Sequence, residues 1–293
     1  MSSKPTSKML AAVGKAGSIP RWIRSVGWQG TSTWVFSEAK RALGFRDPPT
    51  LKIKPRQAQH PVVARLRGSS DMRVFGQIFA CDEYACLRSV SSPHWILDLG
   101  ANVGYSSAYF LSWFPTARVI AVEPDPDNCE LCCRNLRPYG ERARVVHGAA
   151  WPTRTRLVLS RGGREWATRV IAGADREASV EGYDIPSLLE MTGAERIDIL
   201  KVDIEGSELD LFGNHSSSWL RAIGNICVEL HGADCEKVFF EALRDFDYAL
   251  QRSGELTVCL NLRPRVWENR ASERSPTERP LQVGGRERLG SRQ

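Results

Sequence analysis

The chain has 293 residues, of which 42% are hydrophobic and 25% are charged, and its formal net charge at pH 7 is +6. This length can bury a core without disulfide cross-links, and no run of 18 apolar residues occurs, so no transmembrane helix is expected. The N-terminus does not resemble a secretory signal, and the eight cysteines follow no disulfide framework. We therefore expect reduced thiols in a cytoplasmic protein.

Positive charge is concentrated at the two ends of the chain. Residues 1–60 contain eleven Lys or Arg and two Asp or Glu, whereas residues 61–262 have a net charge of −7. Basic segments can bind nucleic acid, but no interleaved aromatic platform or RNA-binding motif accompanies them, so solvated surface charge is the favoured interpretation. We expect a basic, partly helical extension over 1–60, one main domain over 61–262 and a disordered polar tail over 263–293.

Two helical patterns precede residue 95. Apolar residues within 19–45 have the spacing of one or two amphipathic helices, which end before Pro48 and Pro49. Residues 71–87 have a similar pattern, with apolar side chains on one face. These patterns predict an N-terminal helical extension in front of the main sheet.

From residue 95 the sequence alternates between strand and helix patterns. Strands are expected at 95–98, 118–123, 143–147, 197–203 and 225–230, and helices at 104–114, 126–136, 185–192, 207–213 and 234–244. Residues 156–160 predict a further strand or hairpin, and 161–183, rich in Gly and Arg without periodicity, predict an insertion near the functional site. Residues 248–251 and 257–261 are expected to form an antiparallel pair. The alternation indicates an α/β fold in which crossover helices join parallel strands.

A glycine-rich turn follows the first of these strands. Its sequence is Asp98-Leu99-Gly100-Ala101-Asn102-Val103-Gly104, and the next strand ends in Glu123, 25 positions after Asp98. Glycines allow a ligand to approach the main chain, and an acidic residue about 20 positions later holds a ribose diol in nucleotide-binding folds. The pattern predicts a nucleoside-containing cofactor whose ribose hydroxyls donate to Glu123.

The spacing of the glycines favours one cofactor over others. The dinucleotide fingerprint G-x-G-x-x-G requires a second glycine where Asn102 stands, and no phosphate-loop motif occurs in the chain. An NAD-dependent oxidoreductase is therefore disfavoured. A D-x-G-x-x-x-G turn followed by a ribose-binding acid resembles the first two motifs of S-adenosylmethionine-dependent methyltransferases. A strand-to-helix turn that binds nothing is the alternative.

Three motifs in order extend this resemblance. They are Asp98–Gly104, then Val122-Glu123-Pro124-Asp125, then Leu200-Lys201-Val202-Asp203-Ile204-Glu205-Gly206-Ser207-Glu208. Together they resemble the FkbM family of methyltransferases, over roughly residues 62–261. The resemblance implies a Rossmann-like, seven-stranded class I methyltransferase sheet, mostly parallel with one antiparallel strand near the C-terminus. It also implies S-adenosyl-L-methionine as the cofactor.

The candidate cofactor-binding residues follow the first three strands. They are Asp98, Gly100, Ala101, Asn102, Gly104, Tyr105, Glu123, Asp125 and Ala149. Ligands of open α/β sheets bind outside the carboxyl ends of the strands, and there Asp98 is expected to reach the methionine end of the cofactor. Asp125 either assists Glu123 or caps the next helix, and Ala149 is expected to offer backbone contacts to adenine.

The candidate catalytic residues follow the fourth and fifth strands. They are Lys201, Asp203, Glu205, Glu229 and His231, which period-2 alternation places on shared faces. A hydroxyl acceptor needs a base, for which His231 and Asp203 are the candidates. Lys201 either takes part directly in catalysis or forms an internal ion pair with Asp203 or Glu205.

Other polar groups have structural interpretations. Glu208 is expected to be a packing or salt-bridge residue. Asp203, Glu229 and His231 could bind a divalent cation, but their spacing does not require one, and no metal is expected. A C-x-x-C-C pattern in the helix expected at 126–136 predicts buried thiols rather than a zinc site, because no second pair accompanies it. It consists of Cys129, Cys132 and Cys133.

The leading functional hypothesis is methylation of a hydroxyl on a glycan, polyketide or other secondary metabolite, a small-molecule or glycan acceptor. The alternative is a non-catalytic cofactor-binding or scaffold protein that retains the fold. Transfer to nitrogen is disfavoured because no Asn/Asp-Pro-Pro-Tyr/Phe motif occurs. No pattern in the sequence predicts an oligomeric state.

Overall fold

The computed structural model describes residues 22–27, 50–66, 68–161, 168–172, 179–213 and 216–265. Of the helices expected within 19–45, one helical segment at 22–27 is described. Nearly all of the expected polar tail lies outside the described residues. The division of the chain into three parts therefore remains a prediction.

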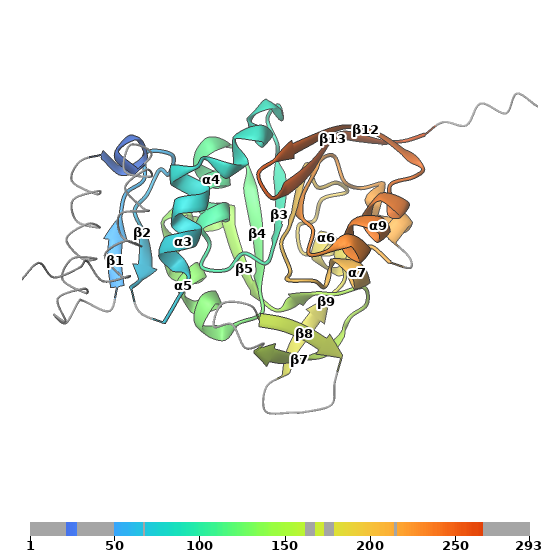
Figure 1. Cartoon of the computed structure of the whole chain (residues 1–293), viewed down its shortest axis with the longest axis horizontal. Helices are drawn as coiled ribbons and strands as arrows, with labels where there is room; N and C mark the ends of the chain where they lie inside the picture. The colour runs from blue at the N-terminus through green and yellow to red at the C-terminus, as the bar shows by residue number, and fades with distance from the viewer. Residues whose placement is uncertain are drawn as a thin grey trace, which may run out of the picture.

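A seven-stranded sheet forms the centre of the molecule (Figure 1). Its strands, in spatial order, are β12 (Phe246–Ser253), β13 (Leu256–Pro264), β11 (Ile226–Glu229), β10 (Ile199–Val202), β3 (Trp95–Leu99), β4 (Arg118–Glu123) and β5 (Ala143–His147). β13 runs antiparallel to both of its neighbours, and the other paired strands are parallel. The sheet confirms the expected class I arrangement, including the antiparallel pair near residue 250.

Helices cover both faces of this sheet. They are α4 (Tyr105–Trp113), α5 (Pro126–Leu136), α6 (Ile185–Glu190), α7 (Glu208–Leu211), α8 (Ser216–Leu220) and α9 (Ala233–Ala242). Successive residues of β4 belong to alternate hydrophobic clusters, with Val119 packed on the α4 side and Ile120 on the α6 side. Because neighbouring strand residues point to opposite faces, apolar residues at every position bury the sheet on both sides.

The segment before the sheet is more varied than the sequence predicts. A hairpin of β1 (Thr50–Ile53) and β2 (Val62–Arg65) was not predicted. The helix expected over 71–87 divides into α3 (Asp71–Phe75), a π-helix η2 (Gly76–Ala80) and a 3₁₀ helix η3 (Glu83–Ser89). The last break falls at Asp82, whose φ of 57° cannot continue a right-handed helix.

A second, four-stranded sheet lies beside the end of β5 (Figure 1). It contains β6 (Ala149–Ala150), β9 (Ser179–Tyr183), β7 (Thr155–Arg161) and β8 (Thr168–Ala172) in that order. The strand expected at 156–160 is confirmed, whereas β8 and β9 were not predicted. A small cluster of buried apolar residues lies on this sheet, and its described members are Ala149, Leu157 and Val180.

The cysteines are free thiols. Cys129 and Cys132 are buried on α5, as expected, but Cys133 is exposed, because it lies on the solvent side of the same helix.

Candidate active site

Two cavities meet at the carboxyl ends of the parallel strands. The first has a volume of about 590 Å³ and is lined by residues that include Glu123, Asn128 and Ala149. The second has a volume of about 950 Å³ and is lined by the candidate catalytic residues and by parts of α3, η2 and η3. Four residues line both cavities and therefore join them: Gly100, Asn102, Asp203 and Glu205.

Gly100 brings the glycine turn against the loop that follows β10. Its φ is +72°, and its N–H and that of Ala101 donate to the carbonyl of Val122, both at 3.0 Å. A Cβ at position 100 would lie 1.7 Å from the backbone oxygen of Asp203. Only glycine fits, so this contact fixes Asp203 at the junction of the two cavities.

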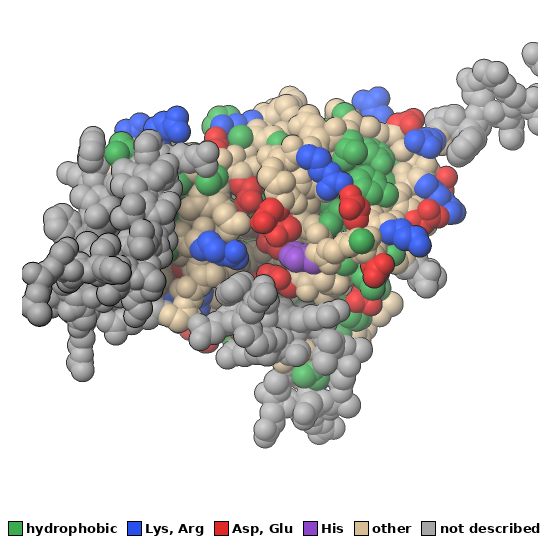
Figure 2. Space-filling model, viewed as in Figure 1, with side chains coloured by type: hydrophobic (Ala, Val, Ile, Leu, Met, Phe, Trp, Pro, Cys, Tyr) green, Lys and Arg blue, Asp and Glu red, His purple; other side chains and the backbone are tan. Residues whose placement is uncertain are grey.

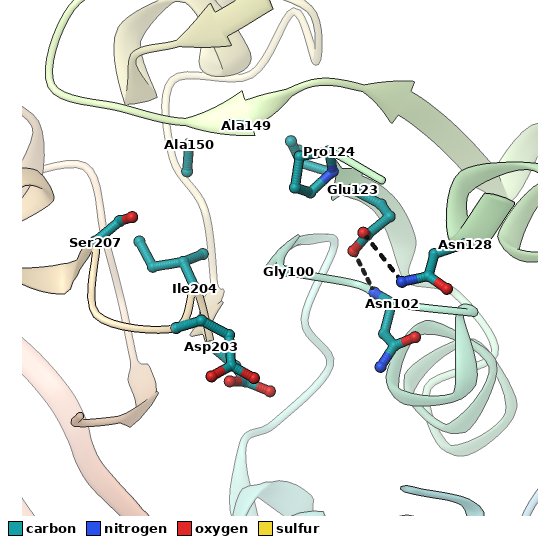
Figure 3. A pocket seen from close by; sticks show the side chains of 12 residues that line it. Gly100, Asn102, Glu123, Pro124, Asn128, Ala149, Ala150, Asp203, Ile204 and Ser207 are labelled. Carbon is teal, nitrogen blue, oxygen red and sulfur yellow. Dashed lines mark hydrogen bonds between the residues drawn. The ribbon is translucent and has the colours of Figure 1, made fainter. Parts of the chain in front are cut away.

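Glu123 is a buried carboxylate at the wall of the first cavity, with its side chain 5% exposed. It accepts hydrogen bonds from the N–H group of Asn102 at 2.8 Å and from the Asn128 amide at 3.4 Å (Figure 3). It also accepts from the N–H group of Asp125 at 3.0 Å. Burial raises the pKa of Glu123 to about 7. A carboxylate has about four acceptor positions, so beside these three donors Glu123 can accept from one more.

The other candidate cofactor residues occupy different positions. Asp125 caps α5, because its side chain accepts from the N–H groups of Asp127 and Asn128, both at 3.0 Å. It lines neither cavity, so capping is the role that the structure shows. Ala149 lines the first cavity. Tyr105 borders the second cavity, but its hydroxyl donates to the carbonyl of Val63 at 2.9 Å.

Asp98 lies beneath the turn and lines neither cavity. It is fully buried, and one carboxylate oxygen accepts from the hydroxyls of Ser106 and Ser107, each at 2.6 Å. Its other oxygen lies 3.1 Å from Nζ of Lys201. These contacts give Asp98 the environment of a buried structural ion pair.

Lys201 is tied to the backbone as well as to Asp98. Nζ donates to the carbonyls of Leu99 at 3.2 Å and Gly100 at 2.7 Å, and Asp203 lies 3.8 Å away. Burial acts to lower the pKa of Lys201, but the charges of Asp98 and Asp203 raise it above its ordinary value. Lys201 is therefore a fixed charge rather than a proton acceptor. Its main acidic partner is Asp98, which the sequence analysis did not consider.

His231 is held by carboxylates. Its Nδ1 lies 3.1 Å from the buried side chain of Glu208, and its Nε2 lies 3.6 Å from both Glu205 and Glu229. The hydrogen bond to Glu208, opposed by burial and reinforced by Asp203 and Glu205, raises the pKa of His231 to about 9. Glu208 thus orients His231. This pair could not be predicted from the sequence, because its members are 23 positions apart and lie on different elements.

The second cavity is strongly acidic. Figure 2 shows acidic side chains around a histidine on this face of the molecule. Burial and the charge of Asp203 raise the pKa of Glu229 to about 7, and burial also raises the pKa values of Glu83 and Glu205. Side-chain O and N atoms of Asp203, Glu205 and His231 lie within 4.8 Å of one another, so this trio, with Glu205 in place of the Glu229 considered from the sequence, has the spacing of a candidate cation site, although no metal was expected.

Three features define a class I methyltransferase fold. They are the strand order, the single antiparallel strand, and the glycine turn that is followed by an acidic residue at the end of β4. The family described as "Methyltransferase FkbM domain" matches residues 98–253, and the chain belongs to this family. Methyltransferase sdnD of Sordaria araneosa is 26% identical over 190 residues, which cover 53% of this chain and 73% of that protein.

Two solved methyltransferases have similar folds. One from Geobacter sulfurreducens is 17% identical and has a TM-score of 0.38, with 79% of this chain and 88% of that chain covered. The precorrin-6y C5,15-methyltransferase of Geobacter metallireducens GS-15 is 12% identical and has a TM-score of 0.36, with coverage of 59% and 81%. Within the described part of this chain, no helix is long and apolar enough to cross a membrane.

Proposed function

We propose that the protein transfers a methyl group from S-adenosylmethionine to a hydroxyl of a glycan, polyketide or other small secondary metabolite. The observation that carries this proposal is the pair of joined cavities. The first cavity offers a buried carboxylate suited to a ribose, and the second contains groups that can bind and deprotonate a hydroxyl. A donor and an acceptor can therefore meet at Asp203 and Glu205, which line both cavities.

The residues of the first cavity fit S-adenosylmethionine. The buried Glu123 carboxylate has an acceptor position left for a ribose hydroxyl, and such a ligand donor would stabilise its charged form against burial. The absence of a side chain at Gly100 leaves the backbone open beside it, and Ala149 and Ala150 offer a flat apolar edge for adenine. The cofactor would supply an activated methyl group on a positively charged sulfur.

The second cavity supplies the proton acceptor. A hydroxyl is weakly acidic, so a base must receive its proton during transfer. His231 is oriented for this role by Glu208, with Nε2 on the side of Glu205 and Glu229. Lys201 is excluded because it is charged and paired with Asp98. We assign the base to His231, and acceptor binding to the carboxylates of Asp203, Glu205 and Glu229.

Calorimetric titration with S-adenosylhomocysteine tests the cofactor assignment. We expect micromolar binding to the wild type, loss of binding in Glu123→Ala and no binding of NAD. Glu130→Ala is the matched control, because Glu130 is an exposed acid on α5 and lines neither cavity. If a folded wild type does not bind S-adenosylhomocysteine, the proposal fails and the non-catalytic alternative takes its place.

Methyl transfer is tested by incubating the enzyme with labelled S-adenosylmethionine and panels of hydroxylated and amino-bearing compounds. Label should enter hydroxyl positions, as identified by mass spectrometry and NMR of the product, and His231→Ala should abolish it while retaining cofactor binding. Label that enters only amino groups would contradict the assignment to oxygen.

A further inference from the structure

Tyr84 of η3 brings an aromatic hydroxyl to the second cavity. Tyr84 lines this cavity and is only 3% exposed, so the ring is almost entirely buried beside it. The ring packs on two aromatic side chains of α4, with its centroid 6.0 Å from that of Tyr109 and 5.0 Å from that of Phe110. This packing fixes the ring, and with it the position of the hydroxyl.

The hydroxyl of Tyr84 makes no hydrogen bond within the described part of the chain. The other buried tyrosines differ in this respect, since the hydroxyls of Tyr105, Tyr109 and Tyr139 donate at 2.9, 3.0 and 3.0 Å. Burying a polar group without a partner costs free energy, so such a group requires an explanation. A hydroxyl at the wall of a cavity can find its partner in a ligand.

The acidic groups of the cavity keep this hydroxyl protonated. Burial, then the charge of Glu83, then further charges that include Asp203 raise the pKa of Tyr84 well above its ordinary value. Tyr84 therefore offers an O–H donor at neutral pH. Asp203 also acts on the imidazole of His231, so it is close enough to influence both groups.

The cavity thus contains two kinds of hydrogen-bonding group. Asp203, Glu205 and Glu229, when ionised, can only accept hydrogen bonds, which suits the O–H of an acceptor. Tyr84 adds a neutral donor, which suits an oxygen atom that has a lone pair to offer. A compound with two neighbouring oxygen atoms matches both kinds.

We infer that Tyr84 donates a hydrogen bond to a second oxygen atom of the acceptor, next to the hydroxyl that is methylated. This inference rests on the proposed function. It narrows the acceptor to compounds in which the reacting hydroxyl has an oxygen neighbour, as in a vicinal diol or a hydroxyl beside an ether or carbonyl. Tyr84 lies outside the 98–253 region that matches the family.

The test combines one substitution with two acceptors. The first is the panel compound that takes up most label from S-adenosylmethionine, and the second is its deoxy analogue, which lacks the oxygen next to the methylated hydroxyl. The wild type should prefer the first about tenfold in kcat/KM, since a site built to bind an oxygen discriminates against its loss. Tyr84→Phe, which removes the hydroxyl alone, should reduce this preference to less than twofold.

Two controls separate binding of the acceptor from a structural role. Tyr84→Phe should leave the melting temperature and the affinity for S-adenosylhomocysteine unchanged, because the hydroxyl has no partner among the described residues. Tyr248→Phe is the matched control and should keep the tenfold preference, since Tyr248 lies on β12 and lines neither cavity.

Three results would overturn the inference. They are an unchanged preference in Tyr84→Phe, a preferred acceptor without a second oxygen, and a lower melting temperature of Tyr84→Phe, which would reveal a partner within the protein. Failure of the wild type to methylate any hydroxylated compound would instead refute the proposed function, and this inference with it.

Discussion

His231 faces carboxylates from the loop after β10, from α7 and from β11. Glu208 contacts Nδ1, Glu205 and Glu229 approach Nε2, and Asp203 adds its charge from the end of β10. Because its pKa is raised to about 9, the free enzyme holds a protonated His231 at neutral pH. The base that we propose must therefore lose a proton before it can accept one.

This requirement predicts the pH profile of the reaction. We expect kcat/KM to rise with pH, with a midpoint near pH 9 where half of His231 is neutral, and to level off above that pH. Glu208→Gln keeps a hydrogen-bond acceptor but removes the charge, so it should lower the pKa of His231 and move the midpoint of the profile one to two pH units lower. Each unit corresponds to about 1.4 kcal/mol of lost stabilisation of the protonated imidazole. Initial rates at saturating cofactor measure both profiles.

Two outcomes would contradict the assignment of His231. A midpoint of the kcat/KM profile near pH 7 would indicate Glu229 as the base, since its pKa is about 7. A profile that Glu208→Gln leaves unchanged would show that His231 does not control the rate. Glu130→Gln serves as the control for loss of a distant negative charge.

Glu123 predicts a second pH dependence, in cofactor binding. Hydroxyl donors favour the charged carboxylate, so binding must displace a proton wherever Glu123 is protonated in the free protein. With a pKa of about 7, affinity for S-adenosylhomocysteine should fall as the pH drops below 7, by up to about tenfold per unit. Calorimetry at pH 6 in buffers of different ionisation heat should detect proton release.

Glu123→Gln should bind more weakly and without this pH dependence. Equal affinity of the wild type at pH 6 and pH 8 would mean that Glu123 is already ionised in the free protein or does not contact the ligand.

At the scale of elements, the sequence predicted the central sheet because its strands are buried on both faces. β3, β4 and β10 are apolar at nearly every position and are followed by glycine or acidic residues. The small sheet lacks this signal. Residues 161–183, which contain β8 (Thr168–Ala172), have no apolar periodicity in the sequence, so this strand, which pairs antiparallel with β7, could not be predicted.

The site was predictable in its location but not in its pairings. Asp203, Glu205, Glu229 and His231 were placed together because the carboxyl ends of parallel strands meet at one edge. The partner of Lys201 depends on the register of β10 against β3, which sets Asp98 opposite Lys201, and the partner of His231 depends on how α7 packs against that edge. The sequence therefore could not distinguish Asp98 from Glu205 as the partner of Lys201, or reveal Glu208 as that of His231.

The glycine turn predicts a large difference between two alanine substitutions. Gly100 and Gly193 both have positive φ, +72° and +66°, but a Cβ meets the Asp203 backbone only at position 100. Gly193→Ala should cost about 1 kcal/mol of unfolding free energy, and Gly100→Ala at least about 2 kcal/mol more. Chemical denaturation measures both. Equal costs would show that the loop after β10 can move away from the turn.

At the scale of the whole molecule, the fold extends beyond the region that matches the family. That region ends at residue 253, within the last residues of the sheet's edge strand β12. β13 follows it and lies between β12 and β11, with Leu256, Val258 and Cys259 buried. The sheet is complete only with residues up to Pro264.

Truncation tests this dependence. A chain that ends after residue 253 should lose cooperative thermal unfolding, because β12 would have no partner and β11 would become an open edge. A chain that ends after residue 265 should unfold cooperatively and bind S-adenosylhomocysteine as the full chain does. Cooperative unfolding of the shorter chain would mean that β12 can pair directly with β11.

The position of β13 also determines when the protein can fold during its synthesis. β11 and β12 are synthesised before β13, the strand that lies between them. They can pair with β13 only after residue 264 has emerged from the ribosome. Until then the nascent chain presents the apolar edge of Ile226–Glu229, which can pair with other chains. The sheet therefore cannot close before residue 264 has emerged, and chaperones that bind exposed strand edges can act until then.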